Sequence, residues 1–451
     1  MKQLGHKVRE NRGLNSATRQ DLTKTAGEVL HDGAVIELVW ADAERASLNL
    51  LVYKNGDAII APTFENAGKI YAPADIDLSI LRATRFPIRL RSFGSARELY
   101  DDTAHRLSRR HDLPEESIAL ATYFVFSAWS PEHLPTAPLL SIIAPPPALG
   151  EPLMQDFSIL CRRPLLLNNP NPADLLALPF DLRPTLLLHV SHAGPELQRQ
   201  LSASLRRRSF FIKKGRAIDL FGPKVVCSRQ PMTDRSLFGA ALEIALSPSR
   251  RPFSIFDQDA IDKEADEFQG KFLSYRLEAL QIARAPQIDC KDLTIPMQAL
   301  ARALAAGIVG NDELQRRVVP LLRRQDQEFQ VDLAESLECI VVEALFTFCH
   351  EVGRQELMVG EVAKAVNTIL AGRGDDRVVS PEDVGWNLKS RDFHTIPIGR
   401  KGKGLELLNS IRKRIHEQAE ICGIRSIQGG AVAKCRHCSE LLAQQGEGRQ
   451  I

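Results

Sequence analysis

The sequence predicts an α/β protein with three parts: a small β-rich domain, a core built on a parallel sheet, and a helical C-terminal region. Short runs of apolar, β-type residues dominate from Val35 to about Leu90. In the next part of the chain, short apolar runs alternate with helical stretches, which is typical of a parallel sheet covered by helices. After about Asp257, longer stretches with one apolar face follow, as in packed helices.

The composition is that of an ordinary globular chain. Its 451 residues allow about two to four domains. The net charge is only +2, so any affinity for nucleic acid must come from local basic clusters. No apolar run is as long as a membrane-spanning helix. The eight cysteines mostly have apolar neighbours, as reduced buried cysteines do. We therefore expect a cytoplasmic protein that does not contact a membrane.

The N-terminal part divides into two segments. Residues 1–30 are polar and lack periodicity, so we expect them to be loose. Residues 31–92 form the predicted β-rich domain, and the pair Asn55-Gly56 between two apolar runs is a strong hairpin signal. The expected strands are Val35–Trp40, Leu48–Tyr53 and Ala58–Pro62.

Residues 93–256 form the predicted α/β core. Ser95 and Glu98 have the spacing of a capping box, which predicts that a helix begins there. A second helix is expected at Pro114–Ser127. Five short apolar runs have the length and composition of buried parallel strands. They are Leu139–Ala144, Leu165–Leu167, Thr185–Val190, Lys224–Ser228 and Glu243–Leu246.

The C-terminal region divides into a helical part, residues 257–357, and a second domain, residues 358–423, followed by a flexible tail, residues 424–451. The helical part has candidate helices at Asp257–Arg284, Pro296–Ala306, Asp312–Arg324 and Glu328–Glu351. The second domain reads as two helices, Met358–Leu370 and Ser380–Ser390, then an extended segment and turn, and a last helix at Leu405–Cys422. Two helices followed by a basic β-hairpin predict a winged helix.

The segment Leu139–Glu151 stands where a strand would enter a phosphate-binding loop of the form G-x-x-x-x-G-K-[ST]. It is followed at the right distance by Cys161-Arg162-Arg163-Pro164. Because the loop segment and the Cys-Arg-Arg-Pro stretch follow each other in this order, the chain from about Phe93 to Gly423 resembles bacterial helicase-like P-loop ATPases of the AAA+/RecA-like kind, which are often tied to mobile DNA. The resemblance implies a P-loop ATPase-like core for the predicted parallel sheet.

The residues that would handle the nucleotide depart from the family pattern. By the resemblance, Ala144 and Leu149 replace the two loop glycines, Gly150 replaces the lysine, and Glu151 replaces the hydroxyl residue. His189 and Val190 stand where the family has two acids, whereas Ser228 retains the polar sensor position. Proline at 147 removes a further backbone donor. We therefore expect degenerate Walker A and Walker B motifs, no catalytic residue, and no binding of ATP or Mg²⁺. The alternative is a proline-rich turn that never bound phosphate.

A basic segment without any acidic residue runs from Leu197 to Ile218. Lys213-Lys214-Gly215-Arg216 lies between two apolar runs, and this pattern predicts a hairpin. Its place in the chain, between the expected strands Thr185–Val190 and Lys224–Ser228, is where many ring helicases carry a DNA-contacting hairpin. Such cations suit contacts to phosphates without reading of bases. The alternative is a solvated charged surface. The candidate DNA contacts are Arg206, Arg207, Arg208, Lys213, Lys214 and Arg216.

The predicted winged helix supplies a second candidate DNA interface, because the second helix of a helix-turn-helix module enters the major groove. A winged helix that docks a protein is the alternative. The candidate contacts are Asn387, Lys389 and Arg391 around that helix, and Arg400, Lys401 and Lys403 on the wing.

Cys435 and Cys438 form a CxxC pair in the tail. A structural zinc needs four ligands. Cys422 and His416 are the nearest additions, but their spacing is not a recognised zinc pattern. Zinc at this pair and a reduced pair in a flexible tail are the two interpretations that remain.

Together these features predict a DNA-associated protein that has lost ATP hydrolysis and acts as a DNA-binding or scaffolding component of a replication or mobile-element system. The resemblance implies that the core is retained for subunit contacts, in a homo-oligomer or in a mixed ring with an active relative. The alternatives are an active ATP-dependent helicase with atypical motifs, a winged-helix transcription regulator, and a decaying gene product without a selected role.

Overall fold

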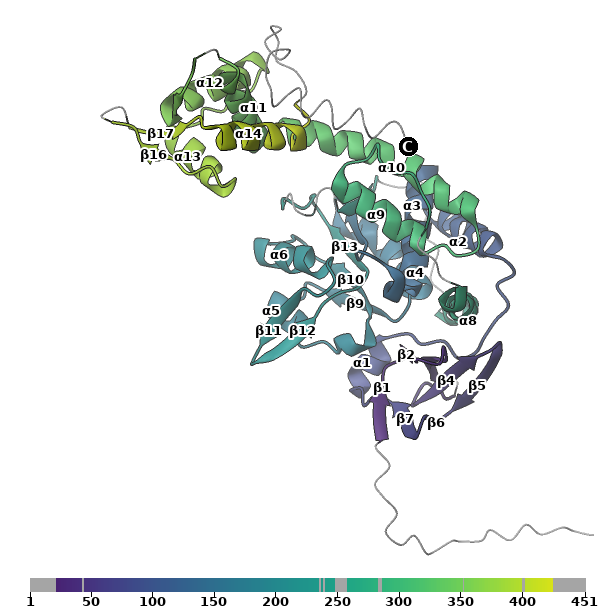
Figure 1. The fold of residues 1–451 in the computed structure, drawn as a ribbon. Coiled ribbons are helices and arrows are strands. Elements are labelled where there is room, and N and C mark those ends of the chain that lie inside the picture. Colours follow the sequence, from purple (N-terminus) through teal and green to yellow (C-terminus); the bar gives the residue numbers. More distant parts are fainter. Residues whose placement is uncertain are drawn as a thin grey trace, which may run out of the picture. The chain divides into compact units, whose positions relative to one another are not determined.

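The structure, a computed structural model, describes residues 22–42, 44–234, 237, 240–247, 258–282, 286–351, 353–399 and 402–424. Contacts divide the chain into two compact units, unit 1 (Met1–Arg323) and unit 2 (Arg324–Ile451) (Figure 1). Throughout these described ranges, the helices are too short or too polar to cross a membrane.

The N-terminal strands of unit 1 form two small sheets. One is antiparallel with the order β2-β3-β4-β5, and the other has the order β1-β7-β6. Asn55 and Gly56 join β4 to β5 with φ angles of 54° and 92°, which is the type I′ turn that the sequence predicted. The strands are β1 (Leu22–Thr25), β2 (Glu28–Val29), β3 (Val35–Trp40), β4 (Leu48–Lys54), β5 (Asp57–Ala61), β6 (Phe64–Asn66) and β7 (Lys69–Pro73).

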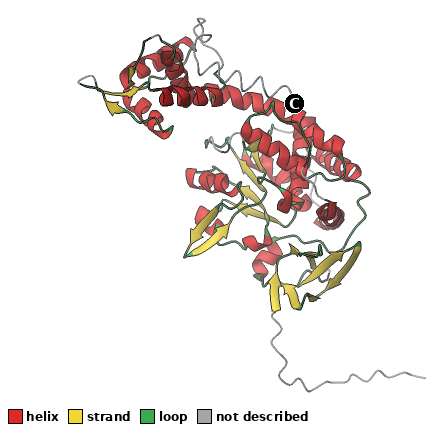
Figure 2. Ribbon diagram, in the orientation of Figure 1, coloured by secondary structure: helices red, strands yellow, loops and turns green. Residues whose placement is uncertain are grey.

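The core of unit 1 is a five-stranded, fully parallel sheet with the order β14-β8-β13-β10-β9. This confirms the predicted parallel sheet, and each strand coincides with a predicted apolar run to within two residues at its ends. The strands are β8 (Leu139–Ile143), β9 (Pro164–Asn168), β10 (Thr185–His189), β13 (Lys224–Ser228) and β14 (Ala241–Ala245). Helices surround this sheet (Figure 2).

Alternation along β8 explains why both faces of the sheet are covered. Leu140 and Ile142 belong to a core cluster with helices α3, α4, α8 and α9, whereas Leu139 packs in another cluster with α6. Successive strand residues point to opposite faces, so a run that is apolar throughout buries both. These and the remaining elements of unit 1 are α1 (Leu78–Ala83), α2 (Ala96–Arg110), α3 (Glu115–Trp129), η1 (Pro131–His133), η2 (Pro147–Gly150), α4 (Glu151–Leu160), α5 (Pro172–Leu175), η3 (Phe180–Leu182), α6 (Pro195–Ser204), β11 (Phe210–Lys213), β12 (Arg216–Asp219), α8 (Gln258–Ile282) and α9 (Ile295–Ala306).

Two local sequence signals for helix starts have different outcomes. The capping box is confirmed, because the Ser95 side chain accepts from the Glu98 N–H and the Glu98 side chain accepts from the Ser95 N–H. The predicted break between Arg324 and Glu328 is wrong: α10 (Asp312–Ala334) continues through it, and α11 (Leu337–Cys349) begins later. The reason is Ser336, whose side chain accepts from the Cys339 N–H and caps α11.

Unit 2 packs helices around a three-stranded antiparallel sheet with the order β15-β17-β16. The expected start of the last helix at Leu405 is wrong. Leu405 is buried in β17 and pairs with Leu357 of β15, so the helix begins only at Asn409. The elements after α11 are β15 (Glu356–Met358), α12 (Val359–Gly372), α13 (Pro381–Ser390), β16 (Ile396–Pro397), β17 (Lys403–Glu406) and α14 (Asn409–Ile421).

The cysteines differ in part from the expectation of reduced thiols. Cys161, Cys227, Cys290 and Cys349 are buried and free, as expected. Cys339 and Cys422, however, form a disulfide with a Cα–Cα distance of 5.5 Å. The cause is tertiary: Cys339 is on α11 and Cys422 directly follows α14, and these two helices pack together.

Candidate functional sites

The altered loop, residues 144–151, lies where a phosphate-binding loop would lie. It follows β8, which is an interior strand between β13 and β14, and it ends where α4 begins at Glu151. Ligands of open parallel sheets bind beyond the carboxyl ends of the strands. The loop therefore lies where a ligand of such a sheet could bind, and what it could bind has to be judged from the residues present.

The loop has few N–H groups to offer a phosphate. Positions 145, 146 and 147 are prolines and have none. The N–H groups of Ala144, Leu149 and Glu151 donate to the carbonyls of Ser228, Pro146 and Ala148. Three prolines and three committed donors leave at most two of the eight positions, Ala148 and Gly150. A working loop binds phosphates with a series of such groups, so this one cannot form the usual cradle.

Position 150, where the resemblance would place a lysine, is closed by packing. Gly150 is buried, and a Cβ atom built on it would lie 2.2 Å from the Sγ of Cys227. Any side chain at this position would therefore have to displace the Sγ of Cys227. The departure from the family pattern is accompanied by compensating packing, so restoring lysine alone would not restore the site.

The charge at the loop is also unsuited to phosphate. Burial raises the pKa of the Cys227 thiol to about 12, and the carboxylate of Glu151 contributes to the rise. Glu151 is exposed at the first turn of α4, where the helix dipole favours an anion. A carboxylate thus occupies the helix terminus that a phosphate would use.

At the strand ends beside the loop, several polar groups already form hydrogen bonds within the chain. The carbonyl of His189 accepts from the Asn169 N–H, and the N–H of Val190 donates to the Cys227 carbonyl. Ser228 is buried, and its Oγ donates to the Gln230 carbonyl at 2.7 Å. The parallel pairing of β10 with β13 therefore brings His189, Val190 and Ser228 to the same end of the sheet, and β10 itself contributes no carboxylate there.

The arginines of the Cys161–Pro164 stretch bind a glutamate of the N-terminal β-rich part. Arg162 donates to Glu37 at 3.0 Å and Arg163 at 2.8 Å, and all three side chains are buried. Arg276 of α8 donates to the same carboxylate at 2.7 Å. The stretch that carries the family resemblance is thus a structural joint. One signal could have revealed it: Glu37 is the one charged residue in the apolar strand Val35–Trp40.

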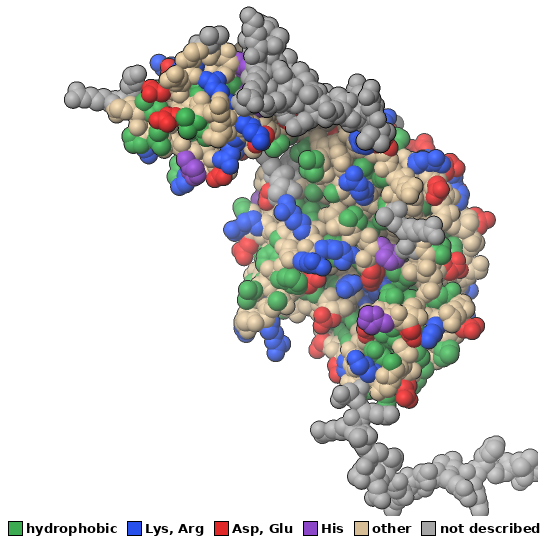
Figure 3. Space-filling model, viewed as in Figure 1, with side chains coloured by type: hydrophobic (Ala, Val, Ile, Leu, Met, Phe, Trp, Pro, Cys, Tyr) green, Lys and Arg blue, Asp and Glu red, His purple; other side chains and the backbone are tan. Residues whose placement is uncertain are grey.

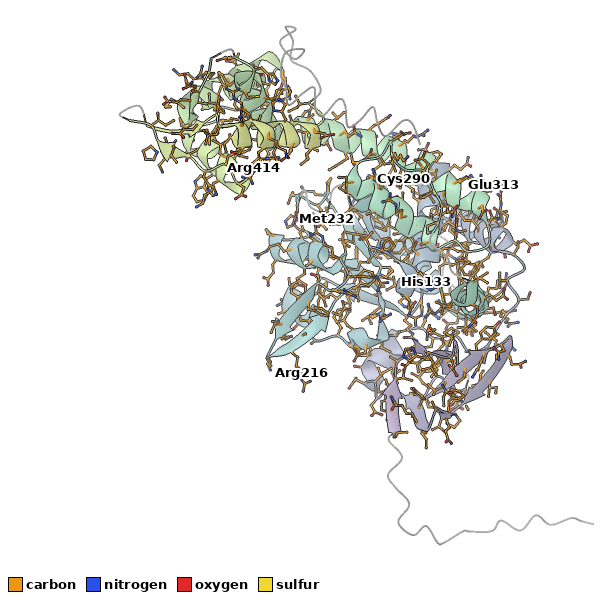
Figure 4. The ribbon with its side chains drawn as sticks, in the orientation of Figure 1. His133, Arg216, Met232, Cys290, Glu313 and Arg414 are labelled. Carbon is orange, nitrogen blue, oxygen red and sulfur yellow. A yellow bond between two sulfur atoms is a disulfide. The ribbon has the colours of Figure 1, made fainter. Side chains whose placement is uncertain are left out.

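The predicted hairpin is present as β11 and β12, with Lys213 paired to Arg216. Lys214 and Gly215 form its turn with φ angles of 49° and 75°. The hairpin lies at the edge of unit 1, and Arg216 points away from the sheet (Figures 1 and 4). Lysine and arginine side chains gather over this edge (Figure 3).

The cations of this basic segment fall into two groups. Arg207 donates to the carbonyls of Leu134, Pro131 and Glu132 and lies over the Phe221 ring, and Lys213 donates to the Ala173 carbonyl. Burial lowers the pKa of Arg207. These two side chains hold the segment in place. Within the described residues, no hydrogen bond or ion pair is formed by the side chains of Arg206, Arg208, Lys214 and Arg216.

The candidate contacts on unit 2 also divide. Lys389 of α13 is exposed, and its Nζ lies 5.5 Å from the ring centroid of Trp386, which is 71% exposed. Asn387 instead donates to the Asp383 carbonyl of its own helix, and Arg391 is hydrogen-bonded to Gln418 of α14. The sequence analysis did not single out Trp386. Its place three residues before Lys389, one turn earlier in the predicted helix, could have indicated that the lysine lies over the indole ring.

A groove of about 1130 Å³ follows the exposed face of α13. It is lined on α12 by Lys364, on α13 by Trp386 and Lys389, and on the β16–β17 side by Lys403. Arg400 and Lys401, and the CxxC pair Cys435 and Cys438, lie outside the described residues. The other proposed zinc ligands are separated, because Cys422 forms the disulfide whereas His416 faces His350.

Comparisons with known proteins do not assign a family. No protein-family model matches the chain, and no curated protein matches it. A full-length MCM homolog from Methanopyrus kandleri is similar at 12% identity over 65% of this chain and 78% of that one, with a TM-score of 0.33. The C-terminal region of NrS-1 is similar at 10% identity over 82% and 96%, with a TM-score of 0.31. Drosophila ORC bound to DNA is similar at 13% identity over 77% and 95%, with a TM-score of 0.18. At such low identities and TM-scores, these likenesses assign neither a family nor an activity.

Proposed function

We propose that this chain is a DNA-binding or scaffolding protein whose helicase-like P-loop core does not hydrolyse ATP. The observation that carries the DNA-binding part is the β11–β12 hairpin. Lys214 in its two-residue turn and Arg216 at the start of β12 have side chains without a hydrogen-bond or ion-pair partner among the described residues. Cations held out on a rigid hairpin, without an acid to neutralise them, suit contacts to the phosphate backbone.

The absence of ATP hydrolysis follows in this proposal from the loop. Three prolines, three committed N–H groups and the contact between Gly150 and Cys227 remove the cradle and the space for a lysine. The two acids of the second motif are replaced by His189 and Val190, so Mg²⁺ has no carboxylate ligand there. An active helicase with atypical motifs would need a different phosphate site.

Unit 2 supplies the second DNA contact of the proposal as a winged helix. Its order is helix α11, strand β15, helices α12 and α13, then strands β16 and β17. Helix α13 presents Trp386 and Lys389 beside a groove that Lys364 and Lys403 also line. In this assignment α13 is the helix that enters the major groove, and the turn between β16 and β17 is the wing.

The role of the core is assembly in this proposal. Cores of the resembled class lie side by side in rings, so we propose a homo-oligomer or a mixed ring with an active relative, in a replication or mobile-element system. Light scattering after size-exclusion chromatography, with and without DNA, measures the stoichiometry. A strictly monomeric protein in both conditions contradicts this part.

The test of DNA binding compares two variants that lose the same charge. K214A/R216A removes the hairpin tip, and K69A/K291A removes two other exposed lysines of unit 1. Affinity for a duplex is measured by fluorescence anisotropy across salt concentrations, with and without ATP and Mg²⁺. We expect weaker binding for K214A/R216A and a salt slope reduced by about 1.8, since each lost phosphate contact removes about 0.9. Equal effects of both variants would contradict a hairpin interface.

A transcription regulator that acts through α13 is the second candidate, favoured by the exposure of Trp386 and by Glu382 at the first turn of the same helix. Glutamate accepts hydrogen bonds from cytosine in the major groove. Selection of binding sites from random duplexes separates the two candidates. One enriched sequence that E382Q loses favours the regulator, whereas no enrichment favours the sequence-independent protein.

A further inference from the structure

Two histidines and a cysteine meet inside unit 2, and none of the three lines the groove along α13. His350 directly follows α11, His416 lies in the middle of α14, and Cys349 is the last residue of α11. Cys349 and His416 are buried, and His350 is half-buried. One potential ligand atom from each residue lies within 4.8 Å of the other two.

The hydrogen bonds fix which nitrogen of each ring faces the other ring. Nδ1 of His350 lies 2.6 Å from the Phe346 carbonyl, and Nδ1 of His416 lies 2.7 Å from the Arg412 carbonyl. A carbonyl only accepts, so both Nδ1 atoms carry the proton and donate. The Nε2 atoms of the neutral rings are then acceptors. They face each other at 3.3 Å.

Two lone pairs that face each other at this distance repel unless a cation or a shared proton lies with them. The distance has a specific meaning for a metal. Two imidazole nitrogens bound at about 2.0–2.1 Å to a tetrahedral ion lie about 3.3 Å apart. Donation of Nδ1–H to a main-chain carbonyl is also the usual support of a metal-binding histidine, because it fixes the tautomer and the ring orientation.

Neighbouring side chains hold both imidazole rings in place. The Phe346 ring packs against both imidazoles, at centroid distances of 4.5 Å and 5.1 Å. The guanidinium of Arg412 lies nearby, but it donates to the carbonyls of Cys349, Arg354 and Leu407. The Sγ of Cys349 lies 3.3 Å from Nδ1 of His350, the nitrogen that faces the Phe346 carbonyl, and a thiolate at this position would offset one charge of a divalent ion.

We propose that Cys349, His350 and His416 bind a borderline divalent metal ion, Zn²⁺ or Co²⁺ by ligand type, with water as the fourth ligand. The ion cross-links the end of α11 to the middle of α14. On binding, the Cys349 thiol loses its proton to solvent, and the two Nε2 lone pairs and the thiolate form the three bonds to the metal. This site uses His416, but neither Cys422 nor the CxxC pair.

The experiment titrates Co²⁺ into the chelator-treated full-length protein and follows thiolate-to-cobalt charge transfer and the visible bands. We expect one equivalent in the wild type and in C435S/C438S, which lacks the CxxC pair. H350Q and H416Q should bind more than about tenfold more weakly, and C349S should lose the charge-transfer band. H394A, which changes an exposed histidine of unit 2, is the matched control and should bind like the wild type.

Opposite results overturn the proposal. They are no binding by the wild type, unchanged binding by H350Q and H416Q, or loss of binding in C435S/C438S. Should a histidine variant not fold, X-ray absorption of zinc-loaded C435S/C438S decides instead: one sulfur and two imidazoles support the site, and any other sulfur count overturns it. Zn²⁺ should also raise the melting temperature of C435S/C438S.

Discussion

Glu37 in β3 accepts a 2.7 Å hydrogen bond from Nε of Arg276 in α8, 239 residues further along the chain. Arg162 and Arg163 bind the same carboxylate, and Arg276 also binds Glu132 at 2.7 Å. Three arginines and two glutamates thus form a network that joins the β-rich part, the sheet and α8. A buried charge left without its partner is costly, so each member of this network depends on the others.

We expect the variant E37Q to be much less stable than the wild type. Glutamine keeps the shape of the side chain but leaves Arg162 and Arg163 without their carboxylate, and breaking a buried ion pair in this way costs about 3–5 kcal/mol. Urea unfolding measures the loss. The control is D32N, which breaks an exposed pair with Lys54 and should cost far less stability than E37Q. Similar losses in both variants would argue against the network.

The same carboxylate predicts a loss of stability in acid. Burial alone would raise the pKa of Glu37, but the charges of Arg162, Arg276 and Arg163 outweigh it and lower the pKa from its ordinary value of 4.5 to about 2. Because the pKa of Glu37 is lower in the folded state than in the unfolded state, the ionised carboxylate contributes fully to the free energy of unfolding above the unfolded-state pKa. This contribution is lost as the pH falls toward 2. The stability difference between wild type and E37Q should therefore shrink from pH 5 to pH 3. A constant difference would contradict this.

Local sequence patterns were sufficient for the framework of the fold. The five core strands, the Asn55-Gly56 turn and the Ser95 capping box depend on residues within a few positions of one another, and all three were predicted. The hairpin at Lys213–Arg216 was predicted for the same reason. The position of the altered loop after β8 followed from the order of the motifs along the chain.

The remaining features depend on contacts between distant segments, which one sequence does not reveal. Arg207 was predicted as a DNA contact from its place in a basic run, but its guanidinium is occupied by carbonyls about 75 positions away. Cys339 and Cys422 form their disulfide across 83 positions. His350 meets His416 across 66 positions. The disulfide and the histidine pair follow from the packing of α11 on α14.

The Cys339–Cys422 disulfide predicts that a reductant weakens unit 2. A disulfide that closes a loop of this length contributes about 2–4 kcal/mol. We expect a lower unfolding midpoint for the wild type after reduction, measured by urea unfolding with and without a phosphine reductant. The variant C339S should start at the lower value and not respond to the reductant. A wild type that is equally stable in both conditions, with all eight cysteines titrating as thiols, would contradict the disulfide.

Lys224 predicts stability that rises with pH. It is buried at the start of β13, where its Nζ donates to the Leu220 and Gly222 carbonyls. Burial lowers the pKa of Lys224 from its ordinary value of 10.5 to about 7. Between these values the unfolded chain binds more protons, so the free energy of unfolding should increase by up to about 1.4 kcal/mol per pH unit. The difference between wild type and K224M, measured at pH 7, 8 and 9, isolates this group and should grow. No change over that range would contradict the prediction.

The contact between Gly150 and Cys227 predicts what happens when the family lysine is restored. A side chain at 150 must displace the Cys227 Sγ, so G150A should cost about 1–3 kcal/mol in the wild type and less in a C227A background. Even G150K/C227A should not bind ATP and Mg²⁺ in a calorimetric titration. Its loop still has prolines at 145, 146 and 147 and the carboxylate of Glu151, so donors are missing and an anion lies at the helix terminus. Micromolar binding by this variant would mean that lysine alone was lacking, and that the loop backbone can still form a phosphate cradle.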